Sequence, residues 1–315
     1  MSIGVLVDSM RYAKENCFIH QLIHSLKLVD NDIKFYDWGR LSRISLLQKK
    51  YKKSIQNHSH IISLCRQRII QKDLPKLTQF LGGGVPIVLY DQDPWNVYWD
   101  DYHTKGLYAS LINNLNIVKI SVPSYFWSQH ISQTESVKTE FVRMGMLPKY
   151  CKLGLPFQER TPGLSFKGQL YEHRLVFFDK IESLGMKVNF ESGNLSYRKY
   201  LKYLHSISVF IHDESAPLVC NGQLIPRSHQ MWHKDVEVAS RGCFVIRDFS
   251  EESKAYDIQS IPTIFMYQNI SEIPELFAKI SNFSASEARS LQLEAVDQIR
   301  LRNDWLNTAK SLIYV

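Results

Sequence analysis

Short apolar runs alternate with amphipathic segments along most of the chain, and this pattern predicts strands that alternate with helices. In the first half we expect strands at Ile3–Val7, Ile33–Tyr36, His60–Cys65, Pro86–Tyr90, Ile117–Ser121 and Lys138–Phe141. The segment Gln71–Leu81 carries its leucines and a phenylalanine on one stripe and stops at a triple glycine, so we expect a helix there. Strands joined by crossover helices form parallel sheets, and the pattern therefore predicts an α/β fold.

A second series of this kind follows a segment without periodicity. Between Met144 and Gly163 glycine and proline are frequent, which indicates a linker between two domains. Beyond it we expect strands at Leu164–Lys167, Lys187–Phe190, Ser208–His212, Phe244–Arg247 and Ile264–Tyr267, a loop up to Pro226, and helices at Glu172–Ser183, Tyr197–Leu204, Gln230–Arg241, Ile273–Ile280 and Ala285–Leu312. A length of 315 residues also favours two α/β domains over one.

Composition narrows the class of protein. The chain is 44% hydrophobic, enough for two cores, but no run of 18 apolar residues and no signal-peptide pattern occurs, so we expect a cytoplasmic protein. Five scattered cysteines lack CxxC spacing, which argues against both a disulfide framework and a zinc site.

The net charge of +7 points to a polyanion or an anionic membrane surface as a partner. The densest basic run is Lys49-Lys50-Tyr51-Lys52-Lys53, which fits contact with phosphates or lipid headgroups, or simply a solvated helix end. Without a recognition motif or interleaved aromatics, nucleic acid is the less favoured partner.

One segment suggests a site for a nucleoside diphosphate. A helix that opens around His233 carries Lys234 and Glu237 three residues apart on one face, beside unpaired backbone N–H groups. Such a helix start favours a diphosphate, the lysine adds a charge-assisted hydrogen bond, and the carboxylate can accept from both ribose hydroxyls. Gly242 would then end the helix in the left-handed conformation. The alternative is an ordinary helix–strand unit whose Lys234 and Glu237 form a solvated pair.

Candidate catalytic carboxylates lie in Val88–Asp101. Asp91 ends a predicted strand, at the edge of a parallel sheet where ligands bind, and a carboxylate in a partly dry cleft suits a general base. Asp93 is the second candidate, although Asp93-Pro94 also fits a helix cap. The aromatic residues that follow would stack on a sugar ring or cover an acceptor: Trp95, Tyr98 and Trp99.

Two histidine clusters complete the candidates. His212-Asp213-Glu214 ends another predicted strand, where His212 either faces the same cleft as Asp91 or simply closes the strand. His229 and His233 have the spacing of a helical metal-ligand pair, but no third ligand has a suitable position. We therefore expect no metal and no cofactor.

The order of motifs in the second half resembles GT-B glycosyltransferases of the CgeB or spore-maturation-protein type. Four elements carry this resemblance: the strand, glycine turn and helix of Leu164–Leu175, the helix before the strand Ser208–His212, the pattern Lys234-xx-Glu237-xxxx-Gly242, and the terminal segment Arg302–Leu306. A weaker resemblance links the chain to phage DNA β-glucosyltransferases.

The resemblance implies two Rossmann-like domains that face a central cleft: an acceptor domain over residues 1–150, a donor domain over 164–295, and a C-terminal helix over 296–315 that packs back on the first. It implies a metal-independent transferase with a UDP- or GDP-linked sugar as co-substrate. By resemblance the donor site comprises Gly168, Gln169, Arg174, His212, Lys234, Glu237 and Ser240.

Two departures from the family pattern leave alternatives open. The family arginine is Lys234 here, which keeps the charge but loses the bidentate fork. The position of a second glutamate that retaining relatives often carry is His229. The alternatives are a DNA-modifying glucosyltransferase and a nucleotide-sugar binding protein without catalysis.

Overall fold

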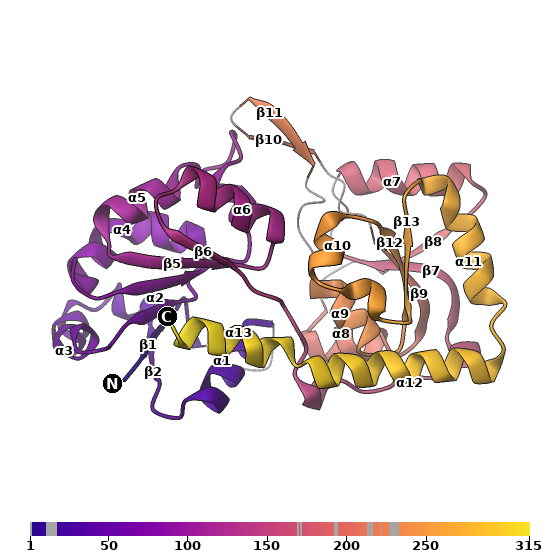
Figure 1. Ribbon diagram of the computed structural model, residues 1–315, viewed down its shortest axis with the longest axis horizontal. Coiled ribbons are helices and arrows are strands. Elements are labelled where there is room, and N and C mark those ends of the chain that lie inside the picture. The colour runs from indigo at the N-terminus through magenta and orange to yellow at the C-terminus, as the bar shows by residue number, and fades with distance from the viewer. Residues whose placement is uncertain are drawn as a thin grey trace. The chain divides into compact units, whose positions relative to one another are not determined.

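The chain folds into two compact units (Figure 1). The computed structural model describes residues 2–10, 18–168, 170, 172–191, 195–212, 217–220, 222–226 and 233–315. Unit 1 comprises Met1–Arg143, Leu218–Ile225 and Trp305–Val315, and unit 2 comprises Met144–Pro217 and Pro226–Asp304.

Unit 1 is built on a six-stranded sheet of order β2-β1-β3-β4-β5-β6 in which neighbouring strands run parallel. Its strands are β1 (Gly4–Val7), β2 (Lys34–Asp37), β3 (Ile61–Ser63), β4 (Ile87–Tyr90), β5 (Ile117–Val122) and β6 (Lys138–Phe141). Its helices are α1 (Phe18–Val29), α2 (Trp38–Leu41), α3 (Ser45–Gln56), α4 (Gln67–Leu81), η2 (Pro94–Val97), α5 (Leu107–Asn114) and α6 (Tyr125–Thr134). All six predicted strands are confirmed. The inner strands β1, β3 and β4 are apolar runs buried along their whole length, whereas the edge strands β2 and β6 are partly exposed.

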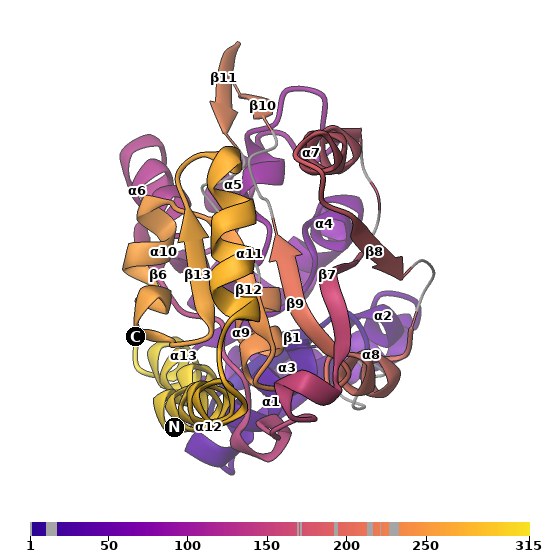
Figure 2. The ribbon, with the colours of Figure 1, turned by 90° about the vertical axis from the view of Figure 1, so that its right-hand side faces the viewer.

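Unit 2 holds a second parallel sheet, of order β13-β12-β9-β7-β8. Its strands are β7 (Thr161–Lys167), β8 (Val188–Glu191), β9 (Ile207–His212), β12 (Phe244–Asp248) and β13 (Ile264–Tyr267). Its helices are η3 (Pro148–Tyr150), η4 (Phe157–Glu159), α7 (Glu172–Ser183), α8 (Tyr197–Tyr203), α9 (His233–Ala239), α10 (Glu251–Ala255), η5 (Ile258–Ser260), η6 (Ile270–Glu272), α11 (Ile273–Ser281) and α12 (Ala285–Arg302). Figure 2 shows α11 alongside β12 and β13. Gly242 follows α9 at φ +64°, which confirms the predicted left-handed turn.

The C-terminal tail is two helices, where the sequence pattern predicted one over Ala285–Leu312. Asn303 adopts a left-handed conformation at φ +41° and separates α12 from α13 (Asp304–Ile313), and asparagine is among the few residues that tolerate this conformation. From Trp305 onward the chain belongs to unit 1. There the Lys119 ammonium donates to the Ser311 carbonyl (2.5 Å) and pairs with Glu140 (3.0 Å).

A β-hairpin occupies part of the segment that was predicted to be a loop. Its strands are β10 (Pro217–Cys220) and β11 (Gln223–Pro226), and residues 218–225 belong to unit 1 although the neighbouring segments belong to unit 2. Asp100 holds the hairpin there: its backbone N–H donates to the Val219 carbonyl (3.0 Å), and its side chain accepts from the Gly222 N–H (2.9 Å). Strands this short leave little alternation to detect in a sequence.

Arg160 fixes the segment that leads into β7. Its side chain is buried and donates to four backbone carbonyls: those of Leu155 (2.7 Å), Leu204 (3.4 Å), Ile207 (3.0 Å) and Arg241 (2.7 Å). The guanidinium thus joins this segment to β9 and to the end of α9. Loss of this donor would remove a hydrogen bond from each of these carbonyls, which is costly for buried groups.

We predict that Arg160→Met lowers the free energy of unfolding by roughly 3 kcal/mol. The substitution keeps an apolar stem but removes the guanidinium hydrogen bonds to these carbonyls. Urea denaturation measures the change. The matched control is Arg198→Met on the exposed face of α8, expected to cost less than about 0.5 kcal/mol. A loss below about 1 kcal/mol for Arg160→Met would show that these bonds are not needed.

Candidate functional site

Three residues expected to bind the donor meet around one aromatic ring at the carboxyl end of β7. The Arg174 guanidinium lies 5.2 Å and the Lys234 ammonium 4.9 Å from the centre of the buried Phe166 ring. The Lys234 ammonium also donates to the Lys167 carbonyl (2.9 Å). A Cβ atom on Gly168 would lie 2.7 Å from this ammonium and 3.0 Å from the Phe166 ring, so the glycine is in close contact with both. Two cations therefore sit at a strand end where an anion would bind.

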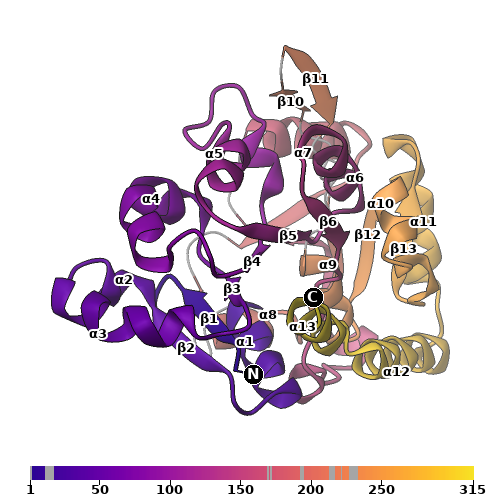
Figure 3. The same cartoon turned by 60° about the vertical axis from the view of Figure 1, so that its left-hand side comes forward.

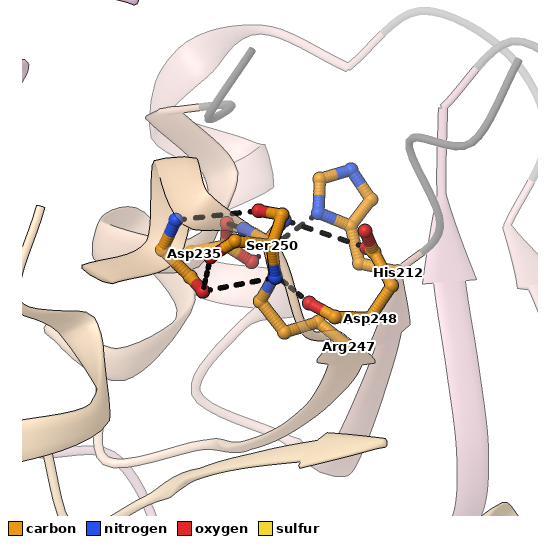
Figure 4. A network of polar contacts seen from close by, with 6 residues as sticks. His212, Asp235, Arg247, Asp248 and Ser250 are labelled. Atoms are coloured by element: carbon orange, nitrogen blue, oxygen red, sulfur yellow. Dashed lines mark hydrogen bonds and ion pairs between the residues drawn. The ribbon is translucent and has the colours of Figure 1, made fainter. Parts of the chain in front are cut away.

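A buried ion-pair network anchors α9, the helix that carries Lys234 (Figure 4). Asp235 pairs with Arg247 of β12 and accepts from His212 Nδ1 (3.2 Å), and all three side chains are fully buried. Burial alone raises the pKa of Asp235, but the charges of Arg247 and His212 outweigh it and hold the pKa below its usual 3.8. His212 thus belongs to the support of the helix.

Sequence reasoning missed Asp235 and Arg247. The available signal was a charged residue at the end of the apolar strand Phe244–Asp248, since a buried charge requires a partner.

The other described residues expected to bind the donor do not join the cluster around Phe166. Ser240 is fully buried and donates to the Glu237 carbonyl (2.7 Å). Gln169, Asp213, Glu214 and His229 lie outside the described residues.

Glu237 is a buried carboxylate in the same helix as Lys234. It pairs with His233 Nδ1 (3.1 Å) one turn earlier and is hydrogen-bonded by Tyr197. Burial would raise its pKa, but the charge of His233, these hydrogen bonds and the charge of Lys234 hold it below 4.5. Glu237 therefore stays ionised, with acceptor capacity left on its two oxygens.

Both ring nitrogens of His233 face acceptors. Nδ1 faces the Glu237 carboxylate and Nε2 lies 2.5 Å from the Gly145 carbonyl, so the ring satisfies both only with two protons. Burial opposes that charge, but the charge of Glu237 and both hydrogen bonds raise the pKa above 6.5. These contacts leave His233 unsuited to bind a metal.

In unit 1 a cavity of about 430 Å³ opens at the carboxyl ends of β1, β3 and β4. Its lining includes Asp8 after β1, Cys65 and Arg66 after β3, and Asp91 after β4. Strands β2 and β3 lie on opposite sides of β1, and ligands of open parallel sheets bind at such a reversal of strand order. The cavity therefore occupies the expected ligand position of this unit.

Asp91 is held rigidly at this cavity. Its Oδ2 accepts from Gln67 Nε2 (2.5 Å) and the Tyr108 hydroxyl (2.7 Å), and its Oδ1 accepts from the Asp93 N–H (3.0 Å). Burial raises its pKa above 3.8, and the three hydrogen bonds oppose that rise. An ionised carboxylate accepts about four bonds, so one acceptor position on Oδ1 remains for a ligand.

The loop after Asp91 is arranged differently from the expectation. Asp93 lines the cavity and is half-buried, and its side chain makes no cap bond to η2. Trp95 and Tyr98 are buried in the core, so their ring faces are not presented to an acceptor, and Trp99 packs partly buried against that core. The aromatic residue of this loop that lines the cavity is Tyr102, which sequence reasoning missed.

A second, larger hollow of about 940 Å³ shares Asp8 and Arg66 with the cavity. We call it the basic groove. Its charged lining residues are Asp8, Asp37, Arg40, Arg43, Arg66, Lys72, Asp73 and Lys76.

No cluster of three metal-ligating side chains occurs within the described residues. In the same part of the chain, no helix combines the length and apolar character that crossing a membrane requires.

We predict that the contribution of His233 to stability depends on pH. A raised pKa in the folded chain means that this contribution is complete below the ordinary pKa of 6.5 and is lost as pH rises through the folded-state pKa. The difference in unfolding free energy between the unmodified chain and His233→Gln should therefore shrink between about pH 5.5 and pH 9. Urea denaturation across this range measures it.

The control measures the effect of His233→Gln on the unfolding free energy in a chain that already carries Glu237→Gln. There the effect should depend little on pH, because the carboxylate that raises the pKa of His233 is gone. A difference that grows with pH would contradict a charged His233.

Several solved structures resemble this chain over nearly its whole length. T4 phage β-glucosyltransferase matches over 100% of both chains at 10% identity with a TM-score of 0.63. Anabaena Alr3699/HepE, solved with UDP and glucose, matches over 99% of this chain and 98% of its own at 11% identity with a TM-score of 0.61. OtsA matches over the same shares at 10% identity, also with a TM-score of 0.61.

No protein-family model matches the chain, and no curated protein matches it. At such low identity the structural likeness shows the fold. The chain has the GT-B architecture of two Rossmann-like domains with parallel sheets.

Proposed function

We propose that this chain is a glycosyltransferase that moves a sugar from a nucleoside-diphosphate sugar to an acceptor hydroxyl. The observation that carries the proposal is the cluster of Gly168, Arg174 and Lys234 around Phe166 in unit 2. Two cations at an open strand end fit a diphosphate. Structural neighbours solved with UDP-glucose, or with UDP and glucose, support this class of donor.

In this proposal unit 2 binds the donor. Lys234 and Arg174 neutralise the diphosphate as it leaves, and Gly168 lets it approach the strand end. Gln169, which was expected beside Gly168, lies outside the described residues. Glu237 accepts hydrogen bonds from the ribose, while His212 helps to hold the helix in place through Asp235. Charges fixed in advance around a leaving group supply a large part of most enzymatic rates. The base of the donor, uracil or guanine, stays open.

Unit 1 supplies the acceptor side of the reaction. Asp91 is our preferred base, because it lines a cavity, keeps one acceptor position on Oδ1 and has a raised pKa. It would take the proton of the acceptor hydroxyl as that oxygen bonds to the anomeric carbon and the diphosphate oxygen departs. Asp93 is the second candidate, and Trp99 and Tyr102 are the aromatic candidates for the acceptor.

The chemistry needs no metal in this scheme, since side-chain cations neutralise the leaving group. T4 phage β-glucosyltransferase has been solved with UDP and Mn²⁺, so metal independence stays an expectation for this chain.

A binding protein without catalysis is the alternative, and donor turnover separates it from an enzyme. That neighbour is also described as a DNA-modifying enzyme, which keeps a DNA hydroxyl among the acceptors to test.

We predict that Lys234→Ala weakens binding of the best nucleoside-diphosphate sugar by about 10- to 100-fold, because it removes a charge-assisted hydrogen bond. Titration calorimetry measures the affinity after a thermal-shift screen of UDP- and GDP-linked sugars has found that ligand. Lys180→Ala, on the exposed surface of α7, is the matched control and should bind normally. Unchanged affinity in Lys234→Ala would remove this cluster from the donor site.

We predict that Asp91→Asn lowers turnover by about 100-fold or more while donor affinity stays nearly unchanged, as expected for loss of a general base. Because burial raises the pKa of Asp91, activity should fall on acidification at a pH above that of an ordinary aspartate. Steady-state kinetics against pH tests both statements.

Asp93→Asn is the internal control and should retain most activity. If Asp93→Asn is inactive and Asp91→Asn is not, the base is Asp93. Full activity in both variants would place the catalytic group elsewhere.

A further inference from the structure

The positive charge of this protein is concentrated in one stretch of unit 1. Between Arg40 and Lys76 the sequence contains ten lysines and arginines and one carboxylate, Asp73. The stretch therefore carries a formal charge of +9, more than the +7 of the whole chain. Such a concentration makes a local field that attracts anions.

Helix α3 presents much of this charge to solvent. Its inner stripe is Leu47, Tyr51 and Ile55, which pack on the core, and Ile55 is fully buried. Its outer face carries four exposed lysines: Lys49, Lys50, Lys52 and Lys53. Figure 3 shows α2 and α3 next to one another at the edge of unit 1.

Two exposed apolar side chains stand at the start of the same helix. Leu46 is 74% exposed and Ile44 is 41% exposed. Leu46 precedes Lys49 and Lys50 by three and four residues, which places it on the helix face that they occupy. An exposed leucine beside several lysines can contact the acyl boundary of a membrane while the lysines reach its headgroups.

The basic groove adds further positive charge beside this helix. Its carboxylates have local partners: Asp8 pairs with Arg66, Asp37 caps α2, and Asp73 accepts from the Trp38 indole. Its exposed cations Arg40, Arg43 and Lys72 have no side-chain partner within the described part of the chain. These cations are available to phosphate groups.

We propose that this basic face, comprising α3, Ile44 and the basic groove, binds the surface of an anionic phospholipid membrane. Lysines near such a surface are attracted by its negative potential, and a leucine adds apolar contact at the acyl boundary. A nucleic acid would use the charge but not Leu46, and a single strand would need stacking rings. The only tyrosine, tryptophan or phenylalanine between Arg40 and Lys76 is Tyr51, which packs on the core.

This binding is independent of sugar transfer, since it requires neither a donor nor Asp91. Failure of one proposal therefore leaves the other standing.

The test is cosedimentation of the full chain with vesicles of 30% phosphatidylglycerol in phosphatidylcholine, about 100 mM salt, compared with pure phosphatidylcholine. We expect binding to the anionic vesicles alone, weakening as salt increases. Each lysine near the surface is worth about fivefold in partitioning, so replacing the four lysines of α3 by glutamine should weaken it at least 100-fold. Leu46→Ser should weaken it several-fold.

The matched control replaces Lys180 and Lys202, exposed residues of unit 2, by glutamine and should bind like the unmodified chain. Thermal unfolding checks that every variant is folded. Absence of vesicle binding, or binding that survives the four α3 substitutions, would overturn the proposal. Tight retention of duplex DNA together with vesicle binding that is insensitive to Leu46→Ser would assign the face to nucleic acid and overturn it as well.

Discussion

Unit 2 depends on one buried ionic network, in which Asp235 is held between Arg247 and His212. Arg247 and His212 are partners in the register of β12 and β9, so their side chains start from neighbouring points on one face of the sheet. Burying three such groups costs desolvation energy, and a network of this kind contributes less to net stability than to the choice of one arrangement. Here the arrangement it selects is the position of α9, and with it the positions of Lys234 and Glu237.

The strand ends of the two units differ in charge. In unit 1 the cavity lining combines the carboxylates of Asp8 and Asp91 with Arg66, which pairs with Asp8, whereas in unit 2 the end of β7 has Arg174 and Lys234 nearby. In the proposed sugar transfer this difference has a use, because an acceptor must lose a proton whereas a diphosphate must gain compensation for its charge. Parallel sheets supply the common position, since all their strands end at the same edge.

The sequence predicted what depends on local periodicity. Buried parallel strands appear as apolar runs, and Gly242 marks the end of α9, so both sheets and α9 were found with bounds close to those observed. Features that depend on tertiary contacts were missed. The hairpin is held by Asp100, more than a hundred residues away from Gly222, and the burial of Trp95 and Tyr98 follows from packing rather than from their aromatic character. The break at Asn303 rests on a single left-handed residue within an otherwise helical pattern.

Asp91 shows how packing turns a residue predicted from its place in a strand into a candidate base. A carboxylate exposed at a strand end would have an ordinary pKa and would exist almost wholly as a weak base at neutral pH. Burial raises its basicity, but the same burial would protonate it if nothing compensated. Gln67, Tyr108 and the Asp93 N–H supply that compensation while leaving part of Oδ1 unoccupied. The balance depends on groups from α4, α5 and the turn together, and for that reason no single segment of the sequence reveals it.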